Sequence, residues 1–189
     1  MSPDGTRVAF TSSDGNLELI GIGGDGRRDL TIGNGYDFGA AWSPDGTHIA
    51  FERYPYDGDR IELRVVDVAT GVEQLIDTGR FPPWSMAMDV TPEWSPDGTL
   101  LAAALWSDEQ DSVVAVWNIG TGTRTDLSPE APGDAVGSMF PSWSPDGTEV
   151  GFISDHDEGP FILHAAHPDG TGLRELTDGS DEVFDPAWS

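Results

Sequence analysis

Trp-Ser-Pro-Asp-Gly-Thr occurs three times in the chain, at Trp42–Thr47, Trp94–Thr99 and Trp143–Thr148. Its two parts also occur separately, because the chain opens with Ser2–Thr6 and closes with Trp188 and Ser189. Proline presets the backbone angle of the second turn position, serine and aspartate can bond nearby amides, and glycine closes the turn without steric cost. Each copy therefore predicts a tight turn that joins two strands.

The segments between these turns follow one recurring order. Each turn is followed by an apolar run, at Arg7–Phe10, His48–Phe51, Leu100–Ala103 and Glu149–Phe152. A run typical of strands comes next, at Leu17–Ile20, Ile61–Val66, Val113–Trp117 and Phe161–Ala165. A more polar run follows, at Asp29–Ile32, Glu73–Ile76, Thr125–Leu127 and Arg174–Leu176. We therefore expect four strands per repeat, lettered a to d, with strand a ending at the tryptophan and the polar strand d at an exposed edge.

The spacing of the repeats indicates the architecture. The motif prolines Pro3, Pro44, Pro96 and Pro145 lie 41, 52 and 49 residues apart, and four-stranded propeller blades take about 40 to 50 residues. We predict an all-β chain that forms one β-propeller domain over residues 1–189, with four antiparallel blades of four strands each. The repeats cover approximately residues 1–41, 42–93, 94–142 and 143–189.

The repeated Ser-Pro-Asp-Gly turn, each time before an apolar strand, resembles the TolB-like propeller repeats. Similar repeats form the propeller domains of tricorn protease and of prolyl oligopeptidases. The resemblance covers essentially the whole chain and implies the fold, whereas proteins of this fold have several unrelated functions. The sequence contains no Gly-x-Ser-x-Gly nucleophile elbow, so we do not expect oligopeptidase activity.

The two ends of the chain predict how the ring closes. Since the chain begins just after a strand a and ends with one, Asp185–Trp188 can pair with the strand that starts at Arg7. Such pairing removes an open sheet edge. It predicts either a monomeric four-bladed ring or two chains that exchange their end strands in an eight-bladed homodimer. A fragment of a longer propeller is the third alternative.

Charge and composition narrow the range of partners. The chain has 34 acidic residues against 9 basic ones, all arginine, and a net charge of -25. Nucleic acid and anionic membranes are therefore disfavoured, and a protein or a small-molecule ligand is the expected partner. The chain contains no cysteine, which excludes disulfides and thiol chemistry. If Met1 is the native start we expect a cytoplasmic protein, and a trimmed chain would be consistent with export.

The loops between strands d and a hold the candidate site residues. Several are longer than the repeat requires, which is where function tends to lie. They carry large apolar groups that either roof the core or wall a ligand pocket, namely Tyr36, Phe38, Trp84, Met86, Met88, Met139, Phe140 and Phe184. Carboxylates at Asp37, Asp89 and Asp185 share this end of the strands and are candidate ligands for a calcium or magnesium ion.

Two hypotheses follow for the function. The first is a non-catalytic propeller for binding or protein interaction, similar to TolB-like proteins, that uses the loops joining strands b to c and d to a. The second is a small-molecule enzyme of the lyase or cyclase type, with an aromatic and acidic pocket at the central mouth. The sequence assigns no catalytic residue and no ligand.

Overall fold

All four Ser-Pro-Asp-Gly-Thr turns form as predicted, with the same hydrogen bonds each time. In the second copy the Ser43 hydroxyl donates to Asp45 Oδ1 at 2.7 Å and accepts the His48 amide at 2.9 Å, and Asp45 Oδ1 also accepts the Thr47 amide at 3.0 Å. Gly46 closes the turn with a φ of 70°, a value that favours glycine. The turns at Ser2, Ser95 and Ser144 repeat this pattern.

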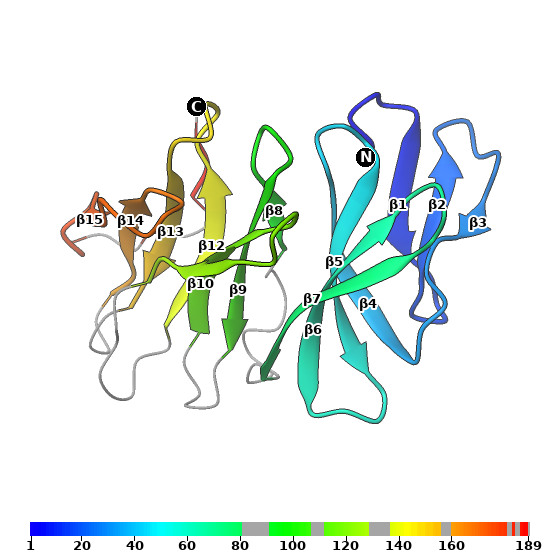
Figure 1. Cartoon of the computed structure of the whole chain (residues 1–189), viewed down its shortest axis with the longest axis horizontal. Coiled ribbons are helices and arrows are strands. Elements are labelled where there is room, and N and C mark those ends of the chain that lie inside the picture. The colour runs from blue at the N-terminus through cyan, green and yellow to red at the C-terminus, as the bar shows by residue number, and fades with distance from the viewer. Residues whose placement is uncertain are drawn as a thin grey trace. The chain divides into compact units, whose positions relative to one another are not determined.

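The computed structural model describes residues 1–80, 91–106, 112–128, 137–155, 160–180, 183 and 186–188. All regular elements in these ranges are β-strands, paired antiparallel within each repeat (Figure 1). No helix in this part of the chain has the length and apolar composition needed to cross a membrane. The chain divides into two compact units, residues 1–81 and 82–189.

The first unit holds two sheets from the first two repeats. One consists of β1 (Arg7–Thr11), β2 (Leu17–Gly21) and β3 (Arg28–Asp29), paired in that order. In the next repeat β4 (Gly35–Trp42), β5 (His48–Pro55), β6 (Arg60–Asp67) and β7 (Glu73–Arg80) pair in sequence order. The core between the two sheets contains Leu17, Leu19, Leu30, Ile49, Phe51, Val66 and Val68.

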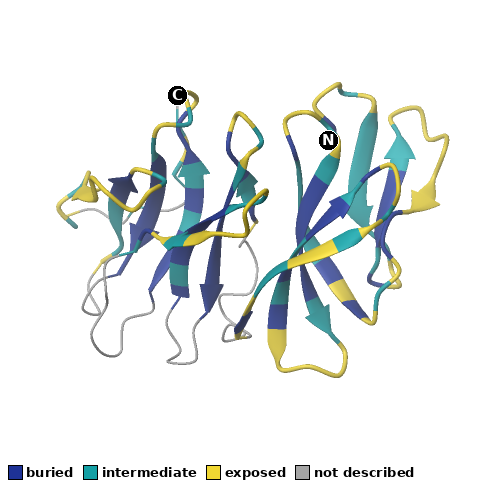
Figure 2. Cartoon of the chain, in the orientation of Figure 1, coloured by how far each residue is buried: buried dark blue, intermediate teal, exposed yellow. Residues whose placement is uncertain are grey.

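The second unit repeats this arrangement. Its first group is β8 (Glu93–Trp94), β9 (Leu100–Trp106), β10 (Ser112–Asn118) and β11 (Arg124–Asp126). Its second is β12 (Ser138–Trp143), β13 (Val150–Ser154), β14 (Ile162–Ala166) and β15 (Arg174–Glu175). Their shared core includes Ala102, Val114, Val116, Leu127, Trp143, Phe152 and Ile153. Figure 2 shows buried residues concentrated in the middle strands and exposed residues at the turns and outer strands.

The predicted strands b and c are confirmed in all four repeats, whereas the outer strand of the first repeat is shorter than predicted. β3 ends at Asp29 instead of continuing to Ile32. The amides of Leu30 and Thr31 both donate to the carbonyl of Leu17, and both side chains are buried. The chain therefore turns toward the core after Asp29 instead of extending along the sheet edge.

Two of the motif tryptophans connect consecutive repeats. Trp143 is buried, and its indole Nε1 donates to the carbonyl of Glu93, the residue before Trp94, at 3.0 Å. Trp188 makes the equivalent bond to Ser142, the residue before Trp143, also at 3.0 Å. Each of these two tryptophans thus ties its repeat to the a strand of the preceding one.

Candidate functional site: the loop face

The loop face is defined as the end of the strands opposite the Ser-Pro-Asp-Gly turns. Its well-described part belongs to the first unit and consists of residues 12–16, 30–36 and 54–59. These segments adjoin because Gly35 faces Pro55 in the β4–β5 register and the Tyr56 amide donates to the Asn34 carbonyl at 3.0 Å. In the second unit the corresponding connections lie largely outside the described residues.

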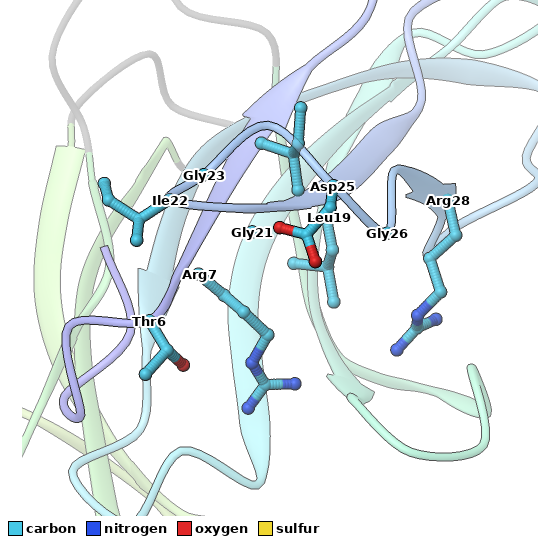
Figure 3. A pocket seen from close by; sticks show the side chains of 10 residues that line it. Thr6, Arg7, Leu19, Gly21, Ile22, Gly23, Asp25, Gly26 and Arg28 are labelled. Atoms are coloured by element: carbon cyan, nitrogen blue, oxygen red, sulfur yellow. The ribbon is translucent and has the colours of Figure 1, made fainter.

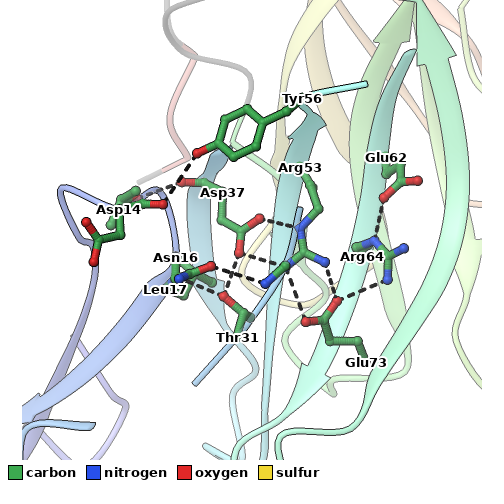
Figure 4. Close-up of polar contacts among 12 residues, drawn as sticks. Asp14, Asn16, Leu17, Thr31, Asp37, Arg53, Tyr56, Glu62, Arg64 and Glu73 are labelled. Atoms are coloured by element: carbon green, nitrogen blue, oxygen red, sulfur yellow. Dashed lines mark hydrogen bonds and ion pairs between the residues drawn. The ribbon is translucent and has the colours of Figure 1, made fainter. Parts of the chain in front are cut away.

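A chain of ion pairs lies beneath the loop face (Figure 4). Arg53 on β5 holds Asp37 on β4 with two hydrogen bonds, Nε to Oδ1 at 2.6 Å and Nη2 to Oδ2 at 2.8 Å. Its Nη1 also donates to Glu73 on β7 at 2.6 Å. Arg64 extends this row of ion pairs by binding Glu73 at 3.0 Å and Glu62 at 2.7 Å. All four strands of this sheet, β4 to β7, are therefore linked by alternating charges.

The Asp37–Arg53 pair is the most deeply buried of these ion pairs. The side chain of Asp37 is 0% exposed and that of Arg53 is 7% exposed. Burial by itself lowers the pKa of Arg53, but its hydrogen bonds to Asp37 and Glu73 outweigh burial and raise that pKa. The guanidinium thus stays charged, and charge-assisted bidentate pairs of this kind fix geometry as well as energy.

Asp37 also connects the loops of the first repeat to the second. Its Oδ2 accepts the Thr31 hydroxyl at 2.5 Å, and its amide donates to the Gly15 carbonyl at 2.7 Å. The Thr31 hydroxyl in turn accepts the Leu17 amide at 2.9 Å. The connections at 12–16 and 30–34 are therefore held against β4 by a buried, hydrogen-bonded carboxylate.

Close backbone approach at this site requires glycine at one position. A Cβ on Gly33 would lie 2.4 Å from Cζ of Arg53, well inside the closest distance that two carbon atoms adopt. The Gly33 amide donates a hydrogen bond to Asn16 Oδ1 at 3.2 Å. Gly33 thus leaves room for the buried guanidinium.

Large apolar side chains project from this ordered frame into solvent. Ile32 is 85% exposed, Tyr56 is 61% exposed and Tyr36 is 47% exposed. The Tyr56 hydroxyl donates to the Asp14 carbonyl at 3.4 Å, which places its ring over the 12–16 connection. The residues Asp14, Asp57 and Asp59 around them are exposed acids. The loop face of the first unit therefore exposes both large apolar side chains and acidic residues.

The predicted site residues occupy different environments. Tyr36 is exposed and Phe38 is half-buried, while Met139 is buried and Phe140 packs against the core of the second unit. Phe140 has a φ of 54°, an unusual value for a residue other than glycine. Trp84, Met86, Met88 and Phe184 lie outside the described residues. The enzyme hypothesis, which rests largely on them, stays a prediction.

The candidate metal ligands are likewise only partly described. Both oxygens of Asp37 accept hydrogen bonds from Arg53, so a cation would have to displace the guanidinium. Asp89 and Asp185 lie outside the described residues. Within the ranges that the structure describes, no group of three or more acidic or histidine side chains has the arrangement of a metal site.

Several functional residues were not singled out from the sequence. Arg53, Glu73 and Tyr56 are the main ones. For Tyr56 the sequence did contain an indication, because Tyr54-Pro55-Tyr56 is an aromatic cluster directly before a polar turn. Glu52 was missed as well. It is 2% exposed, its Oε1 has no hydrogen-bond partner among the described residues, and burial raises its pKa to about 8.

A buried carboxylate also binds the backbone at a loop end in the second unit. The Gly137 amide donates to Asp155 Oδ1 at 2.7 Å, and the Ser112 hydroxyl donates to the Ser138 carbonyl at 2.8 Å. Asp155 is 5% exposed. A buried carboxylate again binds the backbone where a loop enters strand a, so the loop ends of both units are fixed by polar contacts.

Repeated groups of antiparallel strands, with a core between consecutive repeats and a turn motif at one end, define the β-propeller class. The whole chain, residues 1–189, matches the TolB beta propeller domain. The chain belongs to this family, and the resemblance inferred from the Ser-Pro-Asp-Gly turns is confirmed.

Solved structures support the same fold. A putative TolB from Agrobacterium tumefaciens is 22% identical with a TM-score of 0.71, covering 96% of this chain and 61% of its own. TolB from Acinetobacter baumannii is 16% identical with a TM-score of 0.67, covering 93% and 42%. A puromycin-hydrolyzing peptidase from Mycobacterium tuberculosis is 17% identical with a TM-score of 0.69, covering 93% and 29%. The chain thus spans less than two thirds of each structure, and these identities bear on the fold alone.

Proposed function

We propose that this propeller is a non-catalytic binding module that captures a protein segment on its loop face. The observation that carries the proposal is the combination of a buried ion-pair frame with exposed Ile32, Tyr36 and Tyr56 above it. A rigid frame lowers the entropy lost when a surface is ordered by its partner. Tyrosine is enriched at protein interfaces because it offers a large apolar ring and a polar tip.

The charge of the chain defines the chemistry of the partner. With a net charge of -25 and exposed Asp14, Asp57 and Asp59 around the apolar group, the favoured partner carries apolar side chains flanked by lysine or arginine. Opposite charges at the rim speed up association and exclude wrong partners more than they add affinity. Binding should therefore weaken at high salt through slower association.

A peptide library displayed on phage tests this proposal. The library is selected on the wild-type chain, and the enriched peptides are synthesised and titrated against the Tyr36→Ala/Tyr56→Ala double variant. Because truncation of an interface tyrosine costs about 1 to 2 kcal/mol or more, we expect affinity to fall at least tenfold. The enriched peptides should share apolar and basic residues.

Matched control variants remove other exposed apolar groups of the same unit. Val72 is 68% exposed and Leu75 is 49% exposed, and both belong to the outer strand β7 or the turn before it. The Val72→Ala/Leu75→Ala variant should bind the peptides as the wild type does. Peptides that lose affinity equally with both double variants, or with neither, would contradict the use of the loop face.

We also propose that the first sheet is completed by the segment 185–188 as its fourth, innermost strand, which closes four blades into a ring. The tryptophan bonds support this closure. Trp143 and Trp188 each donate to the a strand of the preceding repeat, whereas the buried Nε1 of Trp42 has no partner among the described residues. A strand a beside β1 would supply the carbonyl that Trp42 lacks.

Light scattering during size-exclusion chromatography, at low and high salt, distinguishes the two forms of closure. A mass near 20.2 kDa supports a monomeric ring, and twice that mass supports two chains that exchange end strands. Larger or polydisperse species would indicate an unclosed edge and would count against both. The salt comparison is needed because the large negative charge opposes association at low ionic strength.

A further inference from the structure

A cavity lies at the opposite end of the strands from the loop face. It has a volume of about 410 Å³ and is formed entirely within the first unit, by residues of β1, β2, the turn 21–26 and β3 (Figure 3). Leu19, Ile20 and Ile22 line it with apolar surface, and Arg7 and Arg28 contribute guanidinium groups. A volume of this size suits a small molecule.

These two arginines differ from most others in the chain. Arg7 packs over the Trp42 ring at 5.1 Å from its centroid, and Arg28 donates to the Val68 carbonyl at about hydrogen-bond distance. Neither forms an ion pair with a carboxylate of the described residues. Each of the following arginines does so: Arg27, Arg53, Arg64, Arg124 and Arg174. In a chain with 34 acids and 9 arginines, two unpaired arginines at one cavity are unexpected.

The fourth repeat carries a different pair of residues at these two positions. Arg7 and Glu149 both follow the threonine of the turn motif, and Arg28 and Arg174 occupy the same register on the outer strand. In the fourth repeat Glu149 and Arg174 form a bidentate ion pair, with distances of 2.5 and 2.9 Å. The first repeat replaces the acid of this pair with a second cation. The first repeat therefore lacks the negative charge that Glu149 supplies in the fourth repeat.

The lining offers little to replace that charge. Asp25 is the one carboxylate among the ten lining residues, and it folds back over Gly21, with Oδ1 2.6 Å from where a Cβ on Gly21 would lie. Its backbone carbonyl accepts the Gly21 amide at 2.8 Å, which closes the turn. The cavity therefore keeps an excess of positive charge within a strongly acidic chain.

We infer that this cavity binds a small organic carboxylate. Its anionic group would lie between Arg7 and Arg28, and its apolar body would rest on Leu19, Ile20 and Ile22. Guanidinium groups suit carboxylates because their paired N–H groups match the two oxygens. The site is separate from the loop face and independent of the binding function proposed there.

Benzoate is the probe that tests this site. Titration into ¹⁵N-labelled chain, at constant ionic strength, should shift the amides of residues 21–26 saturably in two-dimensional NMR spectra. Benzyl alcohol, which has the ring without the charge, should bind at least tenfold more weakly. Inorganic phosphate, which has charge without the ring, should also bind more weakly. Equal shifts from benzyl alcohol, tighter binding of phosphate, or no saturable shift with benzoate would each overturn the proposal.

Substitutions then locate the anion. Arg7→Glu recreates the ion pair of the fourth repeat. It should therefore weaken benzoate binding at least tenfold and raise the unfolding temperature. Arg28→Gln should weaken benzoate at least tenfold without that gain in stability. Arg27→Gln is the matched control, because Arg27 lies on the same segment but pairs with Glu18. Unchanged benzoate affinity in Arg7→Glu, or an equal loss in Arg27→Gln, would contradict the assignment.

Discussion

Removal of Arg53 is the sharpest test of the ion pairs beneath the loop face. The Arg53→Met variant keeps most of the aliphatic volume and removes the guanidinium, which leaves Asp37 fully buried with no cation beside it. Breaking a buried ion pair by removing one partner costs about 3 to 5 kcal/mol. Because domains are typically stable by about 5 to 15 kcal/mol, such a loss takes away a large fraction of the stability.

Chemical denaturation at pH 7, followed by tryptophan fluorescence and circular dichroism, measures this loss. Arg64→Met is the matched control, because Arg64 pairs with Glu62 and Glu73 but its side chain is 21% exposed. Exposed pairs contribute about 0 to 1 kcal/mol, so we expect the control to lose about 1 kcal/mol at most. The difference between the two variants isolates the effect of burial.

A double variant separates lost attraction from stranded charge. Asp37→Asn combined with Arg53→Met leaves neither charge buried, so it should be more stable than Arg53→Met alone although it lacks more polar contacts. The argument would be refuted if Arg53→Met cost no more than Arg64→Met. It would also be refuted if the two substitutions of the double variant were simply additive.

Three further predictions concern other buried or hydrogen-bonded groups. Burial raises the pKa of Glu52 from 4.5 to about 8. Its contribution to stability is therefore fully present below about pH 4.5, where the carboxyl is neutral in both states, and is lost progressively as the pH rises to about 8, because the unfolded chain ionises first. Glu52→Gln should therefore match the wild type near pH 4.5 and exceed it by about 3 kcal/mol at pH 7 in urea denaturation, and a constant difference between these pH values would contradict this. The hydrogen bond from Ser43 is the main cause that lowers the pKa of Asp45 to about 2, so its contribution is present above about pH 4 and is lost as the pH falls through 2. Asp45→Asn should thus lower the unfolding temperature at pH 6 and converge with the wild type by pH 2, whereas a gap that persists at pH 2 would show that ionisation is irrelevant. Finally, Trp143→Phe should lower the free energy of unfolding by at least about 1 kcal/mol in the same denaturation assay, because the variant loses the hydrogen bond from the indole to the Glu93 carbonyl. An unchanged free energy of unfolding would show that this bond is unimportant.

The turns and strands followed from the sequence because the interactions that form them are local. Ser43, Asp45 and Thr47 bond to one another within four residues, so their order alone specifies the turn. The strands after each turn are continuous apolar runs, and a run of that kind predicts burial without reference to the partner sheet. Family and fold class therefore needed no coordinates.

The composition of the site depended on tertiary structure. Arg53 is hydrogen-bonded to Asp37, 16 residues away, and to Glu73, 20 residues away. Their spacing in the sequence does not predict these contacts. Strand alternation tells which residues share a face of one sheet, but the identity of the opposing residue depends on register and on a bulge between Phe38 and Ala41. Asp37 was therefore expected as a metal ligand, and the fold surrounds it with an arginine and a threonine.

The two arginines of the cavity, Arg7 and Arg28, show the same dependence on contacts between distant parts of the chain. The sequence places Arg7 directly after a turn and Arg28 on an outer strand, 21 residues later. Only the pairing of β1 with β2 and of β2 with β3 brings them to one cavity. Short-range hydrogen bonds thus determine where this chain turns, whereas the pairing of distant strands decides which charges are neutralised and which stay available to a ligand.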